Sequence, residues 1–387
     1  MKKILILTTV SGFLYKFEMD NVRILQKMRY EVHYASNENL PRYLFDEQMK
    51  QKAGIIFHNI CIEKSPLKYR ENVKALNQIM DIIRREQIQV LHCHTPLGGV
   101  LGRMAGKRCE KMGLSLKIIY TAHGFHFYQG APGFTAVIYR MAEAYLAKYT
   151  DILVTINKED YVNAKKFRLR PGGKVYQIPG VGLNMEYFIP ATEELYQKSR
   201  ERLGISEKQI FLLSVGEVNR NKNQRVIIEG LKLLQCSGRD ISHLRYGICG
   251  EGTEREKLEQ LVHAYQLEKN VTFFDYQKDI RPFLWAADLF LFPSRREGLG
   301  MAALEALSSG VLVIAADNRG TREYMRHGEN GFLCKWDDVS SYIKYISELQ
   351  RMSLDARKQM KINCRKSVER FQKKYTREIM EQVYDNL

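Results

Sequence analysis

The sequence predicts an α/β protein with two doubly wound parallel sheets, and three observations support this fold class. Short apolar runs typical of buried strands alternate with longer amphipathic segments typical of helices along the chain. The alternation breaks once, in the Pro- and Gly-punctuated passage 175–190, and then restarts. The length of 387 residues also exceeds that of one ordinary core. We therefore expect two α/β domains of similar size joined by this linker.

The first domain is predicted over residues 1–183. Its strands are short apolar runs bounded by polar or turn residues, at 3–10, 31–36, 55–60, 90–94, 117–121 and 151–156. A glycine-containing loop is expected at 11–16. Helices are expected at 17–28, 40–52, 72–86, 98–112 and 134–147.

The second domain is predicted over residues 184–365 by the same pattern. Its strands are expected at 211–215, 244–249, 271–274, 288–293 and 311–315, each followed by a polar loop and a helix. The segment 328–331 is expected to be an exposed loop. The charged helices after about residue 354 have no accompanying strand, and we expect them to pack across the junction of the domains.

Composition and charge narrow the class of protein. No apolar run approaches the ~20 residues of a membrane span, and the short run after Met1 lacks a signal-peptide cleavage site, so we interpret it as a strand. The seven cysteines contain no C-x-x-C pair, which fits a reducing compartment. Residues 1–185 hold 28 lysines and arginines against 15 acidic residues, or about +13 of the net +16. This basic half favours an anionic partner over a neutral one, although a solvated surface explains it equally.

The stretch 293–307, P-S-R-R-E-G-L-G-M-A-A-L-E-A-L, is the strongest candidate for a ligand site. It follows a predicted strand, and its second half predicts a helix. Glu297 would lie at the turn and Glu305 roughly 12 Å further on, at ~1.5 Å per residue. Two carboxylates that far apart can hold the ends of one elongated ligand, and the amides of residues 298–300 favour a phosphate between them. The alternative is an amphipathic helix with two solvated glutamates.

Other candidates follow predicted strands, where doubly wound sheets bind ligands. Gly12 follows the first strand, and His94 and His123 lie at the ends of two more. The loop G-E-V-N-R-N-K-N begins at residue 216 and places Lys222 where a cation can neutralise a phosphate, although lysines in such loops are commonly just solvated. Gly250-x-Gly252 is half of a dinucleotide fingerprint, and a packing turn is the alternative. We expect these features to converge on a cleft between the domains.

Histidines raise the question of a metal site. His92 and His94 alternate on a strand and share a face, so with His123 and His126 they could bind zinc. The other interpretation is one buried histidine with polar groups that line the cleft, in which His123 contacts the ligand. No two aspartates lie two residues apart, which argues against a diphosphate held by a divalent ion. We therefore expect no metal and no cofactor.

The helix 98–112 carries a basic stripe. Arg103, Lys107 and Lys111 recur at four-residue spacing, with Arg108 beside them. A basic amphipathic face can rest on anionic lipid. A solvated outer helix is the alternative.

Taken together, these motifs resemble a known family. P-S-x-x-E-G-x-G-x-x-x-L-E-A resembles the E-x7-E signature of retaining GT-B glycosyltransferases of the nucleotide-sugar-dependent family 4, and V-G-E-V-N-R-N-K-N resembles their phosphate-binding loop. L-H-C-H-T-P-L-G-G, T-A-H-G-F-H-F-Y and I-P-G-V-G are similar to the subgroup that builds bacterial exopolysaccharide and capsule. The resemblance covers nearly the whole chain. It implies a GT-B fold of two Rossmann-like domains, with a C-terminal helix, residues 366–387, that returns to the first domain.

The resemblance also implies roles for single residues. Glu297 would bind hydroxyls of the donor sugar, Glu305 the ribose and Lys222 the diphosphate. The implied catalytic residues are His123, Glu297 and Lys222. The implied donor-binding residues are Gly12, Gly216, Arg220, Lys222, Gly250, Glu297, Gly298, Leu299, Gly300 and Glu305. The residues expected at the acceptor or the membrane are Phe13, Lys16, His94, Arg103, Lys107 and Lys111. Family members commonly have an arginine where Glu217 stands, and Arg220 or Arg295 could replace its charge.

The activity implied is transfer of a sugar, with retention and without a metal, from a UDP-sugar to a lipid-linked saccharide. The expected partners are the nucleotide sugar, this acceptor and the anionic inner face of the plasma membrane, with no nucleic acid. The protein is accordingly expected in the cytoplasm, peripheral to that membrane. Two alternatives are a nucleotide-sugar epimerase of the same two-domain form and a basic module that binds membrane or nucleic acid.

Overall fold

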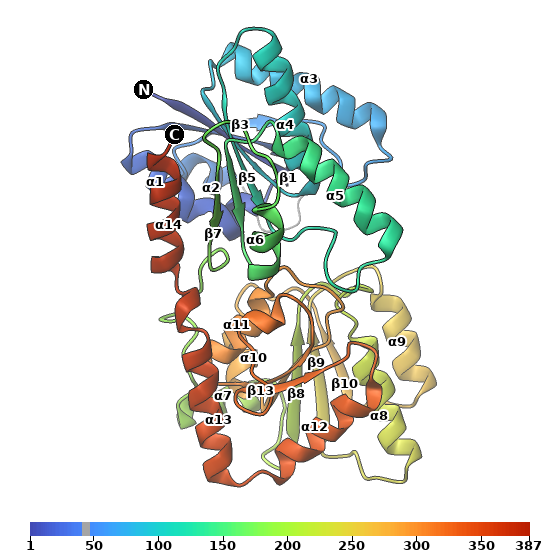
Figure 1. Ribbon diagram of the computed structural model, residues 1–387. Coiled ribbons are helices and arrows are strands. Elements are labelled where there is room, and N and C mark those ends of the chain that lie inside the picture. Colours follow the sequence, from blue (N-terminus) through green and yellow to red (C-terminus); the bar gives the residue numbers. More distant parts are fainter. Residues whose placement is uncertain (41–46) are drawn as a thin grey trace. The chain divides into compact units, whose positions relative to one another are not determined.

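A computed structural model describes residues 1–40 and 47–387 of the protein. The chain divides into two compact units, residues 1–182 with 373–387 and residues 183–372. Each unit contains its own parallel sheet (Figure 1). The chain re-enters the first unit at Lys373 rather than at residue 366, because the preceding helix belongs to the second unit.

The first unit is built on a seven-stranded parallel sheet with the order β3-β2-β1-β4-β5-β6-β7. Its strands are β1 (Lys3–Val10), β2 (Glu31–Asn37), β3 (Ile56–Asn59), β4 (Val90–His94), β5 (Lys117–Ala122), β6 (Ile152–Thr155) and β7 (Lys174–Gln177). The first six agree with the predicted strands. The strand β7 was not predicted, because this short edge strand is polar and partly exposed and lies where a linker was expected.

Helices connect these strands. They are η1 (Leu14–Glu18), α1 (Met19–Lys27), α2 (Glu47–Lys52), α3 (Tyr69–Arg85), α4 (Pro96–Lys111), α5 (Gly133–Ala147) and α6 (Lys158–Ala164), and α14 (Lys373–Asp385) completes the unit. The expected loop at 11–16 is wrong, since η1 is a π-helical turn that begins at Leu14. The expected helix at 40–52 is observed from Glu47 onward, and its earlier part at 41–46 lies outside the described residues.

Glycines explain how α4 packs against the sheet. A Cβ on Gly102 would lie 2.2 Å from Sγ of Cys93, and a Cβ on Gly106 would lie 2.0 Å from Cδ1 of Ile118. Glycine is costly inside a helix, but here it allows the backbone of α4 to approach β4 and β5 closely. Leu101 and neighbouring apolar side chains of α4 then join the core of the unit.

The second unit repeats the plan with a six-stranded parallel sheet of order β10-β9-β8-β11-β12-β13. Its strands are β8 (Ile210–Val215), β9 (Leu244–Cys249), β10 (Val271–Phe274), β11 (Leu289–Phe292), β12 (Leu312–Ala316) and β13 (Gly331–Cys334). Its helices are α7 (Glu193–Arg202), α8 (Arg225–Cys236), α9 (Arg255–Ala264), α10 (Arg281–Ala286), α11 (Met301–Ser308), η2 (Thr321–Glu323), α12 (Val339–Arg351), α13 (Leu354–Ser367) and η3 (Glu369–Phe371). The strand β13 was missed, because its first residue falls in a segment expected to be an exposed loop.

Both sheets reverse their strand order, between β1 and β4 and between β8 and β11. Loops that leave adjacent strands in opposite directions at such a point form a crevice at the carboxyl ends of the strands. The fold therefore directs attention to the loops after β1 and β4 in the first unit and after β8 and β11 in the second.

The helix α14 is fixed to the first unit by polar contacts. The Tyr384 hydroxyl lies 3.0 Å from Nδ1 of His92 on β4, and both side chains are buried. Asp20 on α1 accepts from Arg377 at 2.7 Å and forms an ion pair with Lys373 at 3.1 Å. The C-terminal segment is thus an integral part of this unit.

Candidate active site

The candidate donor site lies in the second unit, where β8 and β11 end side by side. Nζ of Lys222 in the loop after β8 is 2.5 Å from Oε1 of Glu297 in the loop after β11. The side chains are 23% and 13% exposed, and Nζ also lies 5.0 Å from the ring centre of Phe292. Two residues predicted separately from the sequence therefore form one ion pair at the switch point of the sheet.

Asparagines hold the two loops together. Oδ1 of Asn219 accepts from the backbone N–H groups of Asn221 and Lys222, at 3.0 and 2.9 Å. Nδ2 of Asn221 donates to the carbonyl oxygen of Arg296 at 2.9 Å, and Nδ2 of Asn223 donates to that of Pro293 at 3.3 Å, both in the loop after β11. These bonds position Lys222 through the backbone and leave its ammonium group directed at Glu297.

Glycine is required at two positions of this site. Gly300 has φ +91° just before α11, and a Cβ there would lie 2.8 Å from Cε1 of Phe292. Gly250 has φ +138°, and a Cβ there would lie 2.0 Å from the carbonyl oxygen of Gly216. Gly250 therefore lets the loop after β9 touch the loop after β8. This is the role expected if Gly250-x-Gly252 is a packing turn, the alternative to a dinucleotide fingerprint.

The helix α11 carries Glu305 in its second turn, where the side chain is half-buried. Gly298, Leu299 and Gly300 precede the helix, as expected for a turn whose amides face an anion. Gly320 lies in the neighbouring loop, and a Cβ on this glycine would be 3.0 Å from the backbone nitrogen of Leu299. The turn and the helix expected between Glu297 and Glu305 are thus observed, and the clamp of two glutamates stays a prediction.

Three arginines of the second unit differ in their contacts. Arg220 is 80% exposed and lies 3.6 Å from Glu254, and Arg295 lies 4.2 Å from the ring centre of Trp336. Arg319, which was not predicted, is buried, and its Nε donates to the carbonyl oxygen of Glu297 at 3.3 Å. Arg319 follows β12, the strand next to β11, so the strand-end rule applied to that strand would have found it.

The first unit gathers a second set of predicted residues after β1, β4 and β5. Nδ1 of His94 lies 3.2 Å from Nε2 of His123, and the ring of Phe13 lies 5.8 and 5.2 Å from these two imidazoles. Glu18, which was not predicted, places Oε1 3.3 Å from Nδ1 of His94. Glu18 belongs to no sequence motif. It is the last residue of the π-helical turn η1 and not a strand-end residue, so the strand-end rule did not find it.

Burial controls the charge of this cluster. Desolvation raises the pKa of Glu18 to about 8, although a hydrogen bond from Asn21 opposes the shift. Burial lowers the pKa of His123 to about 4 and the pKa of His94 well below its usual range. Both imidazoles are therefore neutral at pH 7. His94 and Phe13 are buried, whereas Lys16 is exposed.

The four histidines do not form one cluster. The rings of His92 and His94 lie 4.1 Å apart, which confirms that they share a face of the strand. His92, however, lies 2.8 Å from Oγ1 of Thr121 and contacts α14, and His126 packs 4.8 Å from the ring of Tyr139. His92 is thus the buried structural histidine that the alternative interpretation required.

The predicted basic face of α4 is wrong at Arg103. This side chain is buried, donates to the carbonyl oxygen of Gly99 at 2.7 Å and to Glu143 at 2.7 Å, and lies 4.0 Å from the ring centre of Tyr120. A glutamate on α5 compensates its charge, which spacing along α4 alone cannot reveal. Lys107 donates to the Tyr145 hydroxyl of α5.

The neighbouring helix α5 shows an exposed apolar face that was not predicted. Phe134, Val137, Ile138, Met141 and Tyr145 recur at helical spacing and are 80%, 56%, 49%, 68% and 48% exposed. A row of large exposed apolar side chains marks an interaction surface. The sequence signal was present in the run F-T-A-V-I-Y-R-M-A-E-A-Y, which is apolar on more than one side. Among the described helices, none is long and apolar enough to cross a membrane.

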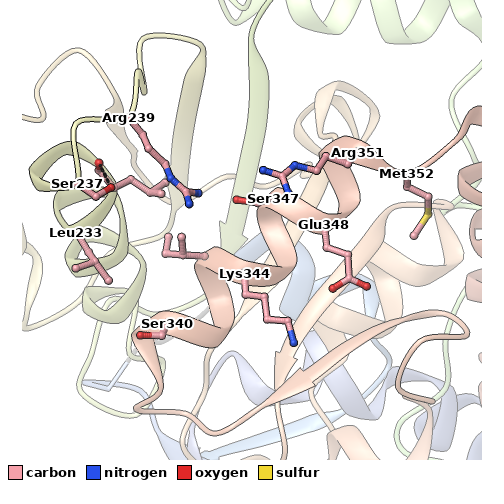
Figure 2. A pocket seen from close by; sticks show the side chains of 11 residues that line it. Leu233, Ser237, Arg239, Ser340, Lys344, Ser347, Glu348, Arg351 and Met352 are labelled. Carbon is pink, nitrogen blue, oxygen red and sulfur yellow. Dashed lines mark hydrogen bonds between the residues drawn. The ribbon is translucent and has the colours of Figure 1, made fainter.

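A cavity of about 760 Å³ lies elsewhere in the second unit, between α8 and α12. Figure 2 shows Arg239 and Arg351 pointing toward one another across it, with Leu233 and Lys344 on its walls. None of the predicted site residues lines this cavity. It therefore belongs to the outer helices and not to the loops at the switch point.

Two parallel sheets in this strand order, with a lysine–glutamate pair at a switch point, define a two-domain protein of the GT-B class. Family comparisons agree with this class. Residues 3–157 match the family model described as Glycosyl transferase 4-like, and residues 196–367 match that of Glycosyl transferases group 1. The chain belongs to the group 1 glycosyltransferases.

Individual relatives extend along most of the chain. EpsD of Bacillus subtilis, which is assigned as a glycosyltransferase, is 36% identical over 383 residues, covering 99% of this chain and 96% of EpsD. The UDP-Gal:alpha-D-GlcNAc-diphosphoundecaprenol alpha-1,3-galactosyltransferase of Escherichia coli is 26% identical over 338 residues, covering 86% and 83% of the two chains.

Solved structures match the fold at low identity. HepE of Anabaena in complex with UDP and glucose superposes with a TM-score of 0.78, at 16% identity and full coverage of both chains. WaaG, a glycosyltransferase involved in lipopolysaccharide biosynthesis, has a TM-score of 0.72 at 18% identity, covering 98% and 99% of the two chains. These likenesses confirm the GT-B fold.

Proposed function

We propose that this protein transfers a sugar, with retention of anomeric configuration, from a UDP-sugar to a lipid-linked saccharide in bacterial surface polysaccharide biosynthesis. The observation that carries the proposal is the ion pair of Lys222 and Glu297 at the switch point of the second sheet. Family membership, the UDP in the HepE structure and the lipid-linked acceptor in the name of the Escherichia coli relative support it.

The donor would divide its contacts between these groups. A diphosphate competes with Glu297 for the ammonium of Lys222, which frees the carboxylate to accept hydroxyls of the sugar. The amides of residues 298–300 and the positive end of α11 add to the same anionic site. Glu305, further along α11, is left for the ribose. No divalent ion is needed on the diphosphate in this scheme, because fixed protein groups meet its charge.

Retention would proceed by attack on the same face from which the diphosphate leaves. A nucleophilic carboxylate is the usual alternative, and Glu18 is the carboxylate beside His123. Burial raises its pKa to about 8, so it is protonated at neutral pH and is a poor nucleophile. The protein therefore contributes position and charge stabilisation, and the leaving phosphate oxygen accepts the proton of the acceptor hydroxyl.

The activity test offers UDP-glucose, UDP-galactose and their N-acetyl forms with a synthetic polyprenyl-diphosphate saccharide. Formation of an α-linked product and release of UDP in the presence of EDTA are expected. Isomerised nucleotide sugar without acceptor would instead identify an epimerase. Salt-sensitive nucleic-acid binding without turnover of any sugar donor would identify the third alternative, a basic binding module.

The exposed face of α5 suits the membrane at which such an acceptor resides. Five large apolar side chains lie on this face, and Arg140 on the helix and Lys148 directly after it are exposed. Apolar side chains beside basic ones favour the interface of an anionic bilayer. We expect a peripheral position at the inner face of the plasma membrane, and α5 replaces the basic face of α4 as its main contact.

Vesicle sedimentation tests this contact. The double variant Phe134→Ser, Met141→Ser should lower binding to phosphatidylglycerol vesicles at least about tenfold, since each buried side chain contributes about 1.5–3 kcal/mol at most. Leu354→Ser is the matched control, because Leu354 is 75% exposed on α13 of the other unit. Equal binding by the double variant and the control would refute the role of α5.

A further inference from the structure

Glu18, His94 and His123 form a set of metal-ligating side chains in the first unit. They come from three elements: the end of η1, the last residue of β4 and the residue after β5. One ligand atom from each lies within 4.8 Å of the other two. Nδ1 of His94 is 3.3 Å from Oε1 of Glu18 and 3.2 Å from Nε2 of His123. Two ligands bonded to zinc at ~2.0–2.1 Å in tetrahedral geometry are separated by about 3.3 Å.

Hydrogen bonds alone do not satisfy the polar atoms of His94. Nδ1 of an imidazole carries either one proton or one lone pair, so it cannot form two linear bonds, to Glu18 and to His123. The other ring nitrogen of His94, Nε2, is buried and has no hydrogen-bond partner in the described part of the chain, so it does not relieve Nδ1 of either contact. A cation placed among the three ligand atoms would satisfy all of them at once.

The surroundings also suit an ion. Nδ2 of Asn21 donates to Oε2 of Glu18 at 2.7 Å, which orients the carboxylate as outer contacts of metal sites do. Phe13 packs against both imidazoles and limits access of water. A recess of about 10 Å³, enough for one water, is lined by Glu18 and His123 and could hold a fourth ligand.

We propose that Glu18, His94 and His123 bind one divalent transition-metal ion of the zinc class through a carboxylate oxygen and two imidazole nitrogens, and that the ion displaces the proton that Glu18 carries without it. Two nitrogens and one oxygen suit zinc, cobalt or iron, whereas magnesium and calcium prefer oxygen ligands alone. Three protein ligands leave a coordination position open, as in catalytic sites. All three ligands belong to the first unit, whereas the proposed contacts of the donor diphosphate belong to the second.

Metal analysis of the whole chain, purified without a metal-affinity tag, tests the proposal. After incubation with zinc and gel filtration, the wild type should retain one zinc per chain. Cobalt should give the visible absorption of a tetrahedral site, and magnesium should not compete. Zinc should raise the melting temperature by mass action, and chelation should reverse the increase.

Variants locate the ion. His94→Gln should abolish binding, and Glu18→Gln, which keeps its shape and a hydrogen bond with Asn21, should weaken it by at least tenfold even if His94→Gln fails to fold. His58→Gln is the matched control: Glu31 and His58 contact opposite nitrogens of His33, at 2.9 Å each, and cannot share one ion with it. A folded wild type that retains no zinc would overturn the proposal and leave a hydrogen-bonded cluster only. Full zinc binding by Glu18→Gln would also overturn it.

Discussion

Replacement of Lys222 with alanine is the sharpest test of the candidate donor site. The lysine lies 2.5 Å from Glu297 in a partly enclosed setting, with side chains 23% and 13% exposed. Opposite charges at 4 Å interact by about 1 kcal/mol in water and about 4 kcal/mol at the effective dielectric of a protein surface. Loss of one preorganised group that meets developing charge lowers turnover by about 10²–10³-fold. We expect that loss in kcat/KM for the UDP-sugar.

The same change has a measurable effect on folding. Without the lysine, Glu297 loses its ion-pair partner, and only 13% of its side chain is exposed. Breaking a buried pair costs about 3–5 kcal/mol and breaking an exposed pair less than about 1 kcal/mol, so we expect a loss of about 1–3 kcal/mol in urea unfolding. The control is Lys198→Ala, since Lys198 and Glu194 lie 2.6 Å apart but are 70% and 74% exposed.

A second variant separates charge from shape. Glu297→Gln keeps an oxygen that can accept from Lys222 but removes the negative charge, so the protein should stay folded and lose sugar-dependent turnover. The donor-site assignment fails if Lys222→Ala keeps kcat/KM within about threefold of the wild type while Lys198→Ala behaves identically. It also fails if UDP binding measured by calorimetry is unchanged in both site variants.

Three further predictions concern the fold that supports the sites. Gly300→Ala should lower the melting temperature more than Gly328→Ala, because both glycines have positive φ but only at Gly300 does a Cβ meet a side chain within 4 Å. Tyr384→Phe should cost about 1–3 kcal/mol by leaving Nδ1 of the buried His92 without a partner, whereas Tyr375→Phe at an exposed position of α14 should be neutral. Burial, and then the charge of its histidine partner on β2, lowers the pKa of His58. The folded state therefore binds fewer protons than the unfolded state, so His58 contributes stability above about pH 6.5 that decreases below it. His58→Gln should flatten the pH dependence of urea unfolding between pH 7.5 and 5.5, and an unchanged slope would contradict this assignment.

Strands inside the sheets were predicted from the sequence more completely than strands at the edges of the sheets. Eleven of the observed strands coincide with predicted ones, because apolar runs bounded by polar loops carry a strong signal. Both missed strands, β7 and β13, lie at the edge of a sheet. The sequence of β7 looks like that of a loop because this strand is polar and partly exposed. The strand β13 is apolar and mostly buried, and it was missed because its first residue falls in a segment expected to be an exposed loop.

Candidate site residues were predictable where one loop contains the whole motif. Glu297, Glu305 and the turn between them form such a motif, and so does the polar loop with Lys222. Arg103 shows the limit of this reasoning: the spacing of basic residues on α4 is real, but Glu143 on another helix draws Arg103 into the interior. The partner of a buried charge is set by packing between elements that are distant in the sequence.

The sequence by itself therefore determined the two Rossmann-like sheets, the family and the loops that follow the strands, since all of these are local patterns repeated along the chain. Only the tertiary structure decided which side chains meet. It paired Lys222 with Glu297 across 75 residues, brought Glu18 to two histidines and left the apolar face of α5 exposed. The physical reason is that strand order and helix packing, rather than spacing along the chain, set the distances between charged and apolar side chains.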